Sequence, residues 1–187
     1  TGRQDKGLEE ARRGLALDPL SPLKNSLMSR AFYVTRQYDK ALEQALSAVE
    51  TNPTAFGGYC DLGEAYLQKR MYAEAITEIQ KALPLSGNTP FVTGLLGYAY
   101  AVSGNRAEAL KIVGEMKESA KQRYVSAYHV ALVYAGLGEK GQALDWLEKA
   151  YEEHNEPLIW VGVDPKLDPL RSDPRFVRLL QRLNLPT

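Results

Sequence analysis

The sequence predicts an all-α fold in which antiparallel helix pairs stack into an α-solenoid with a right-handed superhelical course. The first observation is a pattern that recurs every 34 residues through five copies without an insertion or a deletion. The second is that apolar residues in each half-repeat recur at spacings of three and four, the period of a helix, while no segment is predicted as a strand. Because one helix pair cannot bury its own apolar surface, each pair is expected to pack on the next.

Small and aromatic residues at fixed positions define the repeat. A small residue where two helices touch lets their backbones approach closely, and an aromatic ring three residues later fills the space beside that contact. The aligned positions hold a first small residue at Ser29, Gly63, Gly97 and Ala131, an aromatic residue at Phe32, Tyr66, Tyr100 and Tyr134, a second small residue at Gly7, Ala41, Ala75, Ala109 and Ala143, and a last column at Gly14, Ala48, Ala82, Met116 and Ala150.

Each full repeat is expected to contain two helices, A and B. The predicted pairs are Ser21–Thr35 with Tyr38–Glu50, Ala55–Lys69 with Tyr72–Leu83, Thr89–Ser103 with Arg106–Ser119, and Lys121–Leu137 with Lys140–Glu153. The array then divides into residues 1–19, 22–55, 56–89, 90–123, 124–157 and 158–187. Residues 1–19 match only the second half of a repeat, so we expect further repeats or another domain before Thr1 in the natural protein.

The turns between helices agree with this division. Asp18-Pro19 and Asn52-Pro53 occupy the same repeat position, and a proline there ends a helix. Gly104 and Gly138 lie between helices A and B, where a left-handed residue ends helix A. Arg36 and Arg70 occupy the same position and are expected to take that conformation less easily.

After Asn155 the period loosens. Glu156–Val163 is the expected sixth helix A, and a last helix is expected to start from Ser172 or Asp173 as N-cap, with Pro174 in the first helical position, and to reach about Leu183. Its apolar stripe is Phe176, Leu179, Leu180 and Leu183, and its opposite face carries Arg175, Arg178 and Arg182. A helix with one face to dock and one face for water is suited to cap the array.

The quoted positions resemble the tetratricopeptide repeat family across almost the whole chain. The segment from Asp168 to Phe176 is similar to the closing segment of such arrays in bacterial multidomain signalling proteins, which often carry a kinase or a winged-helix DNA-binding domain. The resemblance implies a protein-interaction scaffold whose concave groove binds a peptide or a partner helix. The alternative is a self-associating module that positions an attached domain.

In the family, helix A of each repeat lines the groove. By position, the groove residues here are Ser26, Arg30, Tyr33, Cys60, Asp61, Glu64, Gln68, Phe91, Gly94, Tyr98, Ala101, Tyr128, His129 and Leu132. Family members that clamp a C-terminal carboxylate use lysine and asparagine. Here the lysine positions hold Ser26, Cys60, Gly94 and Tyr128, and the asparagine positions hold Arg30, Glu64, Tyr98 and Leu132. The sequence therefore departs from the carboxylate clamp, and Tyr98 and Tyr128 are the tyrosines expected to serve a surface function.

For several other residues, a structural role and a chemical role are both consistent with the sequence. Cys60 is either a small groove-wall residue or a reactive thiol, and His129 is either a packing residue or a ligand contact. The aspartates before Pro165, Pro169 and Pro174 suit turns and caps and lack calcium-loop spacing. The arginines from Arg171 to Arg182 form a solvated face or a site for nucleic acid or an acidic partner.

Composition and the absence of known motifs argue against several classes of function. The formal net charge is zero, so no overall field recruits nucleic acid or a membrane surface. One cysteine allows no intrachain disulfide, and no signal peptide or membrane-spanning run is visible, so a cytoplasmic location is expected. No phosphate loop, nucleophile elbow or metal motif occurs, so neither an enzyme nor a cofactor is expected. The expected partner is a protein or peptide, with self-association through the uncovered N-terminal flank as a further expectation.

Overall fold

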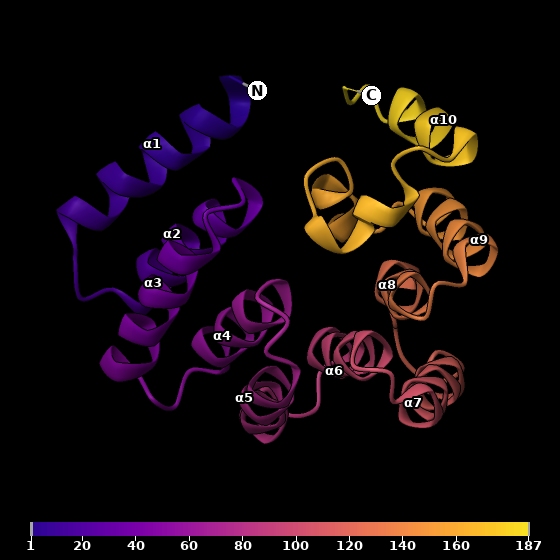
Figure 1. Cartoon of the computed structure of the whole chain (residues 1–187), viewed down its shortest axis with the longest axis horizontal. Coiled ribbons are helices and arrows are strands. Elements are labelled where there is room, and N and C mark those ends of the chain that lie inside the picture. The colour runs from indigo at the N-terminus through magenta and orange to yellow at the C-terminus, as the bar shows by residue number, and fades with distance from the viewer. Residues whose placement is uncertain (1, 187) are drawn as a thin grey trace. The chain divides into compact units, whose positions relative to one another are not determined.

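The computed structural model describes residues 2–186, with side chains from residue 5 onward, and divides into two compact units. Thr1 and Thr187, the ends of the predicted array, lie outside the described residues. All regular elements of the described chain are helices (Figure 1). The predicted all-α fold is confirmed.

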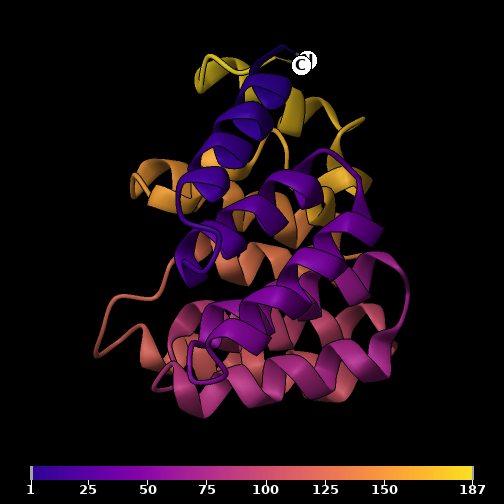
Figure 2. The same ribbon diagram turned by 90° about the vertical axis from the view of Figure 1, so that its left-hand side faces the viewer.

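The described part of the first unit, residues 2–88, contains five α-helices (Figures 1 and 2). They are α1 (Gly2–Leu17), α2 (Pro22–Val34), α3 (Tyr38–Thr51), α4 (Phe56–Gln68) and α5 (Tyr72–Leu85). Leu8, Ala11 and Leu15 of α1 pack against a core that includes Met28 and Phe32.

The column of small residues has the packing role predicted for it. A Cβ atom added at Gly63 of α4 would lie 2.4 Å from Cγ1 of Ile79 on α5. Ile79 and Ala75 are fully buried beneath that contact. Helices A and B of this repeat therefore approach more closely than any larger residue at position 63 would allow.

The second unit, residues 89–187, contains two helix pairs and a C-terminal region (Figure 1). The pairs are α6 (Pro90–Val102) with α7 (Arg106–Ser119) and α8 (Ala127–Gly136) with α9 (Lys140–Glu152). The C-terminal region contains two 3₁₀ helices, η1 (Glu156–Trp160) and η2 (Pro165–Leu170), and a last α-helix, α10 (Pro174–Arg182).

Most predicted helices agree with the structure to within two residues, but α8 does not. It begins at Ala127 rather than Lys121. Ser126 before it is extended (φ −61°, ψ 124°), and its hydroxyl donates to Oδ1 of the buried Asn155 at 2.7 Å. This hydrogen bond joins Ser126 to the end of the same repeat and holds the chain in an extended conformation. The helix therefore begins later in the sequence than predicted.

The predicted sixth helix A is also wrong. Residues 156–170 form η1, a turn and η2 in place of one α-helix. Proline at positions 157, 165 and 169 removes amide donors and disfavours the α conformation of each preceding residue, so only short 3₁₀ turns form. The repeat register nevertheless persists, because α10 begins 34 residues after α9.

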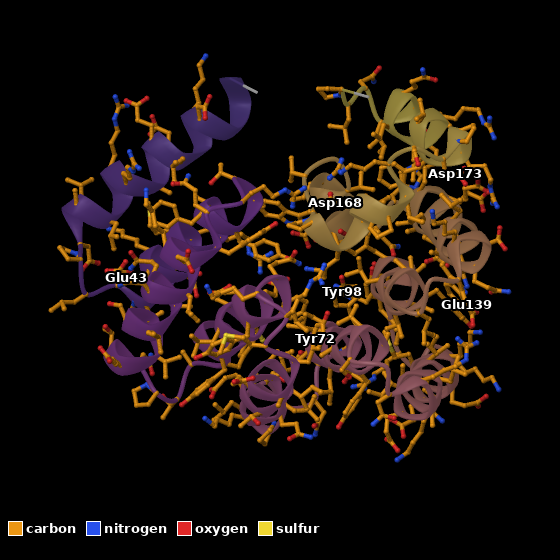
Figure 3. The ribbon with its side chains drawn as sticks, viewed as in Figure 1. Glu43, Tyr72, Tyr98, Glu139, Asp168 and Asp173 are labelled. Atoms are coloured by element: carbon orange, nitrogen blue, oxygen red, sulfur yellow. The ribbon has the colours of Figure 1, made fainter. Side chains whose placement is uncertain are left out.

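The cap of α10 is as predicted, whereas its arginines are less free than expected. Asp173 is the N-cap, and its carboxylate accepts from the backbone amide of Arg175 at 2.8 Å (Figure 3). Arg175 also pairs with Asp145 at 2.6 Å and Glu148 at 2.9 Å on α9, and these hydrogen bonds, Glu148 first, raise the pKa of its guanidinium. Arg175 therefore ties α10 to α9 rather than facing water alone.

The turns between helices A and B confirm the left-handed position. Its φ angle is 65° at Arg36, 60° at Arg70, 87° at Gly104 and 75° at Gly138. An L-residue in this region is strained by roughly 1–2 kcal/mol, and glycine is not. In the turns between helices A and B, the first unit thus carries a strain that the second unit avoids by using glycine.

Candidate functional site

The predicted groove residues lie on helices α2, α4, α6 and α8, the A helices of the repeats. Ser26, Arg30, Gln68, Phe91 and His129 are half-buried, and Tyr33, Cys60, Asp61, Glu64, Gly94, Tyr98, Ala101, Tyr128 and Leu132 are buried. Each unit brings its own members of this set together, and the two sets differ in chemistry.

In the first unit, the facing sides of α2 and α4 form a charged network. Arg30 Nη2 lies 3.2 Å from Glu64 Oε2 and 3.7 Å from Asp61 Oδ1. Both carboxylates are buried, with 6% of the Asp61 side chain and 4% of the Glu64 side chain exposed, while 27% of Arg30 is exposed. Burial of two carboxylates requires such compensation, because an unpaired buried charge is costly.

Further hydrogen bonds extend this network along both helices. The Ser26 hydroxyl donates to Asp61 Oδ2, and the Gln68 amide donates to the Tyr33 hydroxyl at 3.3 Å. Each pair joins residues 35 apart, and Arg30 and Glu64 are 34 apart. One repeat length therefore places these side chains against each other on successive A helices.

Cys60 lies on the same helix, and 1% of its surface is exposed. Nucleophilic or redox chemistry needs a thiolate that solvent or substrate can reach. The burial favours the structural reading of Cys60.

In the second unit, the corresponding side of α6 and α8 is aromatic. The rings of Phe91 and His129 lie 5.6 Å apart at 59°, and those of Tyr128 and His129 lie 5.9 Å apart at 78°. Gly94 makes this contact feasible, because a Cβ there would come within 2.8 Å of the His129 Cβ. Residues 94 and 129 are again 35 apart.

The tyrosines expected to serve a surface function are buried. Tyr98 is 8% exposed, and its ring lies against α8, where a Cβ at Gly136 would approach it to 3.0 Å (Figure 3). Tyr128 is 3% exposed, and its hydroxyl donates to Asp164 Oδ2 at 2.8 Å. Ala101 and Leu132 are buried on the same two helices.

The C-terminal region covers Tyr128 with residues that the sequence reading placed in turns or overlooked. Asp164 caps η2 by accepting from the Lys166 amide at 2.9 Å, and its carboxylate lies 3.3 Å from Lys166 Nζ. Both residues are buried. The one sequence signal is spacing, since Asp164 follows Tyr128 by 36 residues, close to one repeat.

Among the described residues, no group of three or more histidine, cysteine, aspartate or glutamate side chains could hold a metal ion. Within the same part of the chain, no helix combines the length and apolar character needed to cross a membrane.

Residues 57–89 match the family model described as tetratricopeptide repeat. This segment has the sequence of a tetratricopeptide repeat. This match includes most of α4 and all of α5, and it confirms the family suggested by the 34-residue period. No curated protein sequence matches the chain at a significant level.

Solved tetratricopeptide repeat structures have the same fold. The crystal structure of TTC0263, a thermophilic TPR protein in Thermus thermophilus, is 22% identical with a TM-score of 0.68, over 98% of this chain and 92% of that one. The structure of YrrB, a TPR protein with an unusual peptide-binding site, is 16% identical with a TM-score of 0.51, over 94% and 91%. The Cut9–Hcn1 structure is 12% identical with a TM-score of 0.63, over 97% of this chain and 36% of that one.

Proposed function

We propose that this chain is a protein-interaction scaffold that binds an extended peptide or a partner helix on the exposed parts of its A helices. The tetratricopeptide repeat fold supports a scaffold role, and one protein of this fold, YrrB, is described by its peptide-binding site. The observation that carries the proposal is that polar or aromatic side chains of successive A helices meet, with Arg30 against Glu64 and Phe91 against His129.

The first unit would recognise polar groups of the ligand. Arg30 is more exposed than the two carboxylates with which it pairs, and its planar guanidinium can accommodate a carboxylate or a peptide carbonyl. Asp61 and Glu64 fix the position of its guanidinium through ion pairs. A side chain already fixed by two carboxylates loses little rotamer freedom when a ligand binds.

The second unit would recognise an apolar side chain. Phe91 and His129 are half-buried and already in contact, so they offer a preformed aromatic surface. Aromatic anchors of this kind commonly supply much of the binding energy in peptide recognition.

The ligand should not need a free C-terminus. Ser26 and Cys60 stand where the clamp lysine would be, and Cys60 is buried. We therefore propose recognition of an internal segment, and a role as a scaffold without catalysis.

The test uses peptides selected from a displayed random library on the 187-residue chain, with binding measured by calorimetry. Exchange of the Arg30 and Glu64 side chains (Arg30→Glu with Glu64→Arg) keeps an ion pair but reverses its direction, and Phe91→Ala removes the aromatic anchor. Each is expected to weaken binding at least about tenfold. The matched control exchanges the exposed pair Glu9 and Arg13 on α1, which should bind normally.

If the selected peptides bind both variants as tightly as the original chain, and circular dichroism shows that the variants are folded, the A helices are not the binding surface. Binding that is lost when the peptide C-terminus is amidated would instead contradict recognition of an internal segment.

A further inference from the structure

Two lysine ammonium groups lie over one tryptophan ring on the B helices of the second unit. Nζ of Lys117, in the last turn of α7, is 5.4 Å from the centre of the Trp146 ring on α9, and Nζ of Lys149 is 4.6 Å from the same ring. The indole is half-buried, and both lysines are exposed. We call Lys117, Trp146 and Lys149 the lysine–tryptophan cluster.

Lys117 is held in place although it is exposed. Its Nζ donates to the hydroxyl of Tyr134 on α8 at 2.9 Å and lies 5.3 Å from the centre of that ring. Tyr134 itself is buried, so it is a firm support. An exposed lysine normally loses rotamer freedom when a ligand fixes it, and these contacts have already removed part of that freedom.

The cluster lacks a carboxylate that its equivalent in the first unit has. The positions 68 residues, or two repeats, before Trp146 and Lys149 are Glu78 and Lys81, and these two residues form an ion pair at 2.8 Å. In the second unit the tryptophan replaces the glutamate, and Lys149 pairs only with Glu153, at 3.7 Å. The tryptophan thus stands where the first unit neutralises its lysine.

Neighbouring carboxylates of α7 and α9 pair with other cations. Glu118 pairs with Lys121 at 2.8 Å, and Asp145 and Glu148 pair with Arg175 at 2.6 and 2.9 Å. Within the part of the chain that the structure describes, no carboxylate forms an ion pair with the cluster's lysine on α7. The cluster is therefore locally positive in a chain whose formal net charge is zero.

The approach to Lys117 along α7 is open. Gly114 lies one turn before Lys117 on the same side of the helix, and a Cβ atom added there would have no neighbouring atom within 4 Å. Glu115 is two residues before Lys117 and so faces a different side of α7. A ligand can therefore reach the ammonium group from the side of Gly114.

We propose that the lysine–tryptophan cluster binds an acidic segment of a partner protein. Carboxylates of that segment accept hydrogen bonds from Lys117 and Lys149, and its apolar carbon atoms pack on the exposed part of Trp146. Charge complementarity favours this occupant, because the cluster has two cations and lacks the acid of its first-unit equivalent. Two lysines on a chain of zero net charge give little of the field that nucleic acid binding requires.

This surface belongs to the B helices, whereas the ligand site proposed above belongs to the A helices. The inference is therefore independent of that function, and one chain can hold both partners.

The test pans a displayed library of short random peptides against the 187-residue chain. The soluble variant Lys117→Gln with Trp146→Gln is present in excess as a competitor, so it removes peptides that bind elsewhere. The retained peptides should be rich in aspartate and glutamate, and added salt should weaken their binding. Their binding should also change the emission of Trp146, measured in a Trp160→Phe background where it is the only tryptophan.

A pair of substitutions at one position separates charge from folding. Gly114→Glu places a carboxylate one turn before Lys117, where it pairs with the lysine and repels an acidic peptide. It should raise the peptide dissociation constant at least about fivefold. Gly114→Ala is the matched control, because it replaces the same glycine without adding charge and should leave the dissociation constant unchanged. Circular dichroism checks that every variant is folded.

Several results would overturn the proposal. They are a panning experiment that retains no peptide, retained peptides that are not acidic, and equal weakening of binding by Gly114→Ala and Gly114→Glu. Tighter binding of oligodeoxythymidine than of the acidic peptides, followed by the emission of Trp146, would assign the cluster to nucleic acid instead.

Discussion

The A-helix face of residues 2–88 is built from charged groups, and that of residues 89–186 from aromatic rings. Ser26 and Arg30 meet Asp61 and Glu64 in the first unit, whereas Phe91 meets His129 in the second. The contacting residues are 34 or 35 apart in the first unit and 38 apart in the second, so in both units they come from successive A helices. The repeat thus fixes where side chains meet but leaves their chemistry free, because packing depends on the small residues at the helix contacts and not on the face.

The two units also differ in the kind of side chain that their terminal segments expose. The first unit presents exposed leucines, while the second ends in a helix that buries its apolar stripe and exposes Arg178 and Arg182. An array exposes apolar surface wherever its last A helix lacks a neighbour, and a polar cap removes that exposure.

The largest effect should come from the cap. Phe176 is fully buried, so Phe176→Ala should lower the free energy of unfolding of the second unit by about 3–5 kcal/mol. Both tryptophans, Trp146 and Trp160, belong to this unit, so denaturant titration followed by tryptophan emission reports it directly. A loss below about 1 kcal/mol would show that α10 contributes little to stability.

A smaller loss of stability is expected when either hydroxyl–carboxylate hydrogen bond is removed, and the two losses should differ. Tyr128→Phe removes a buried hydrogen bond to Asp164 and should lower the free energy of unfolding by about 1–3 kcal/mol. Ser26→Ala removes the equivalent bond to Asp61, but Ser26 is half-buried and water can replace it, so about 0.5–1.5 kcal/mol is expected. Tryptophan emission measures the unfolding of the Tyr128→Phe variant, and circular dichroism measures that of the Ser26→Ala variant. An equal loss of stability in both, or a larger loss for Ser26→Ala, would contradict the expected effect of burial.

The smallest effect should come from the A–B turns. Arg70→Gly should raise the stability of the first unit by up to about 1 kcal/mol, because relief of the left-handed strain exceeds the added entropy of the unfolded chain. Gly104→Ala should lower the stability of the second unit by about 1 kcal/mol for the converse reason. Melting curves by circular dichroism and tryptophan emission measure the two shifts, and shifts of the same sign would contradict the strain at Arg70.

The sequence predicted the repeat, the helices of four full pairs and the turn conformations at Arg36, Arg70, Gly104 and Gly138. These features follow from local rules, since helix period, proline geometry and left-handed strain act within a few residues. It failed where a distant contact decides the local conformation. The hydroxyl of Ser126 bonds to Asn155, 29 residues away, and thereby delays α8.

For the candidate site too, the sequence predicted some features and the tertiary structure decided others. The sequence alone predicted which residues lie on the A helices, because a 34-residue period assigns every position to a column, and the family resemblance suggested which of them share one face. Only the tertiary structure decided that Arg30 is held by two buried carboxylates, and that Asp164 and Lys166 cover Tyr128. Those contacts depend on how neighbouring helices pack and on a C-terminal region without α-helical period, and neither is written in the spacing of residues along the chain.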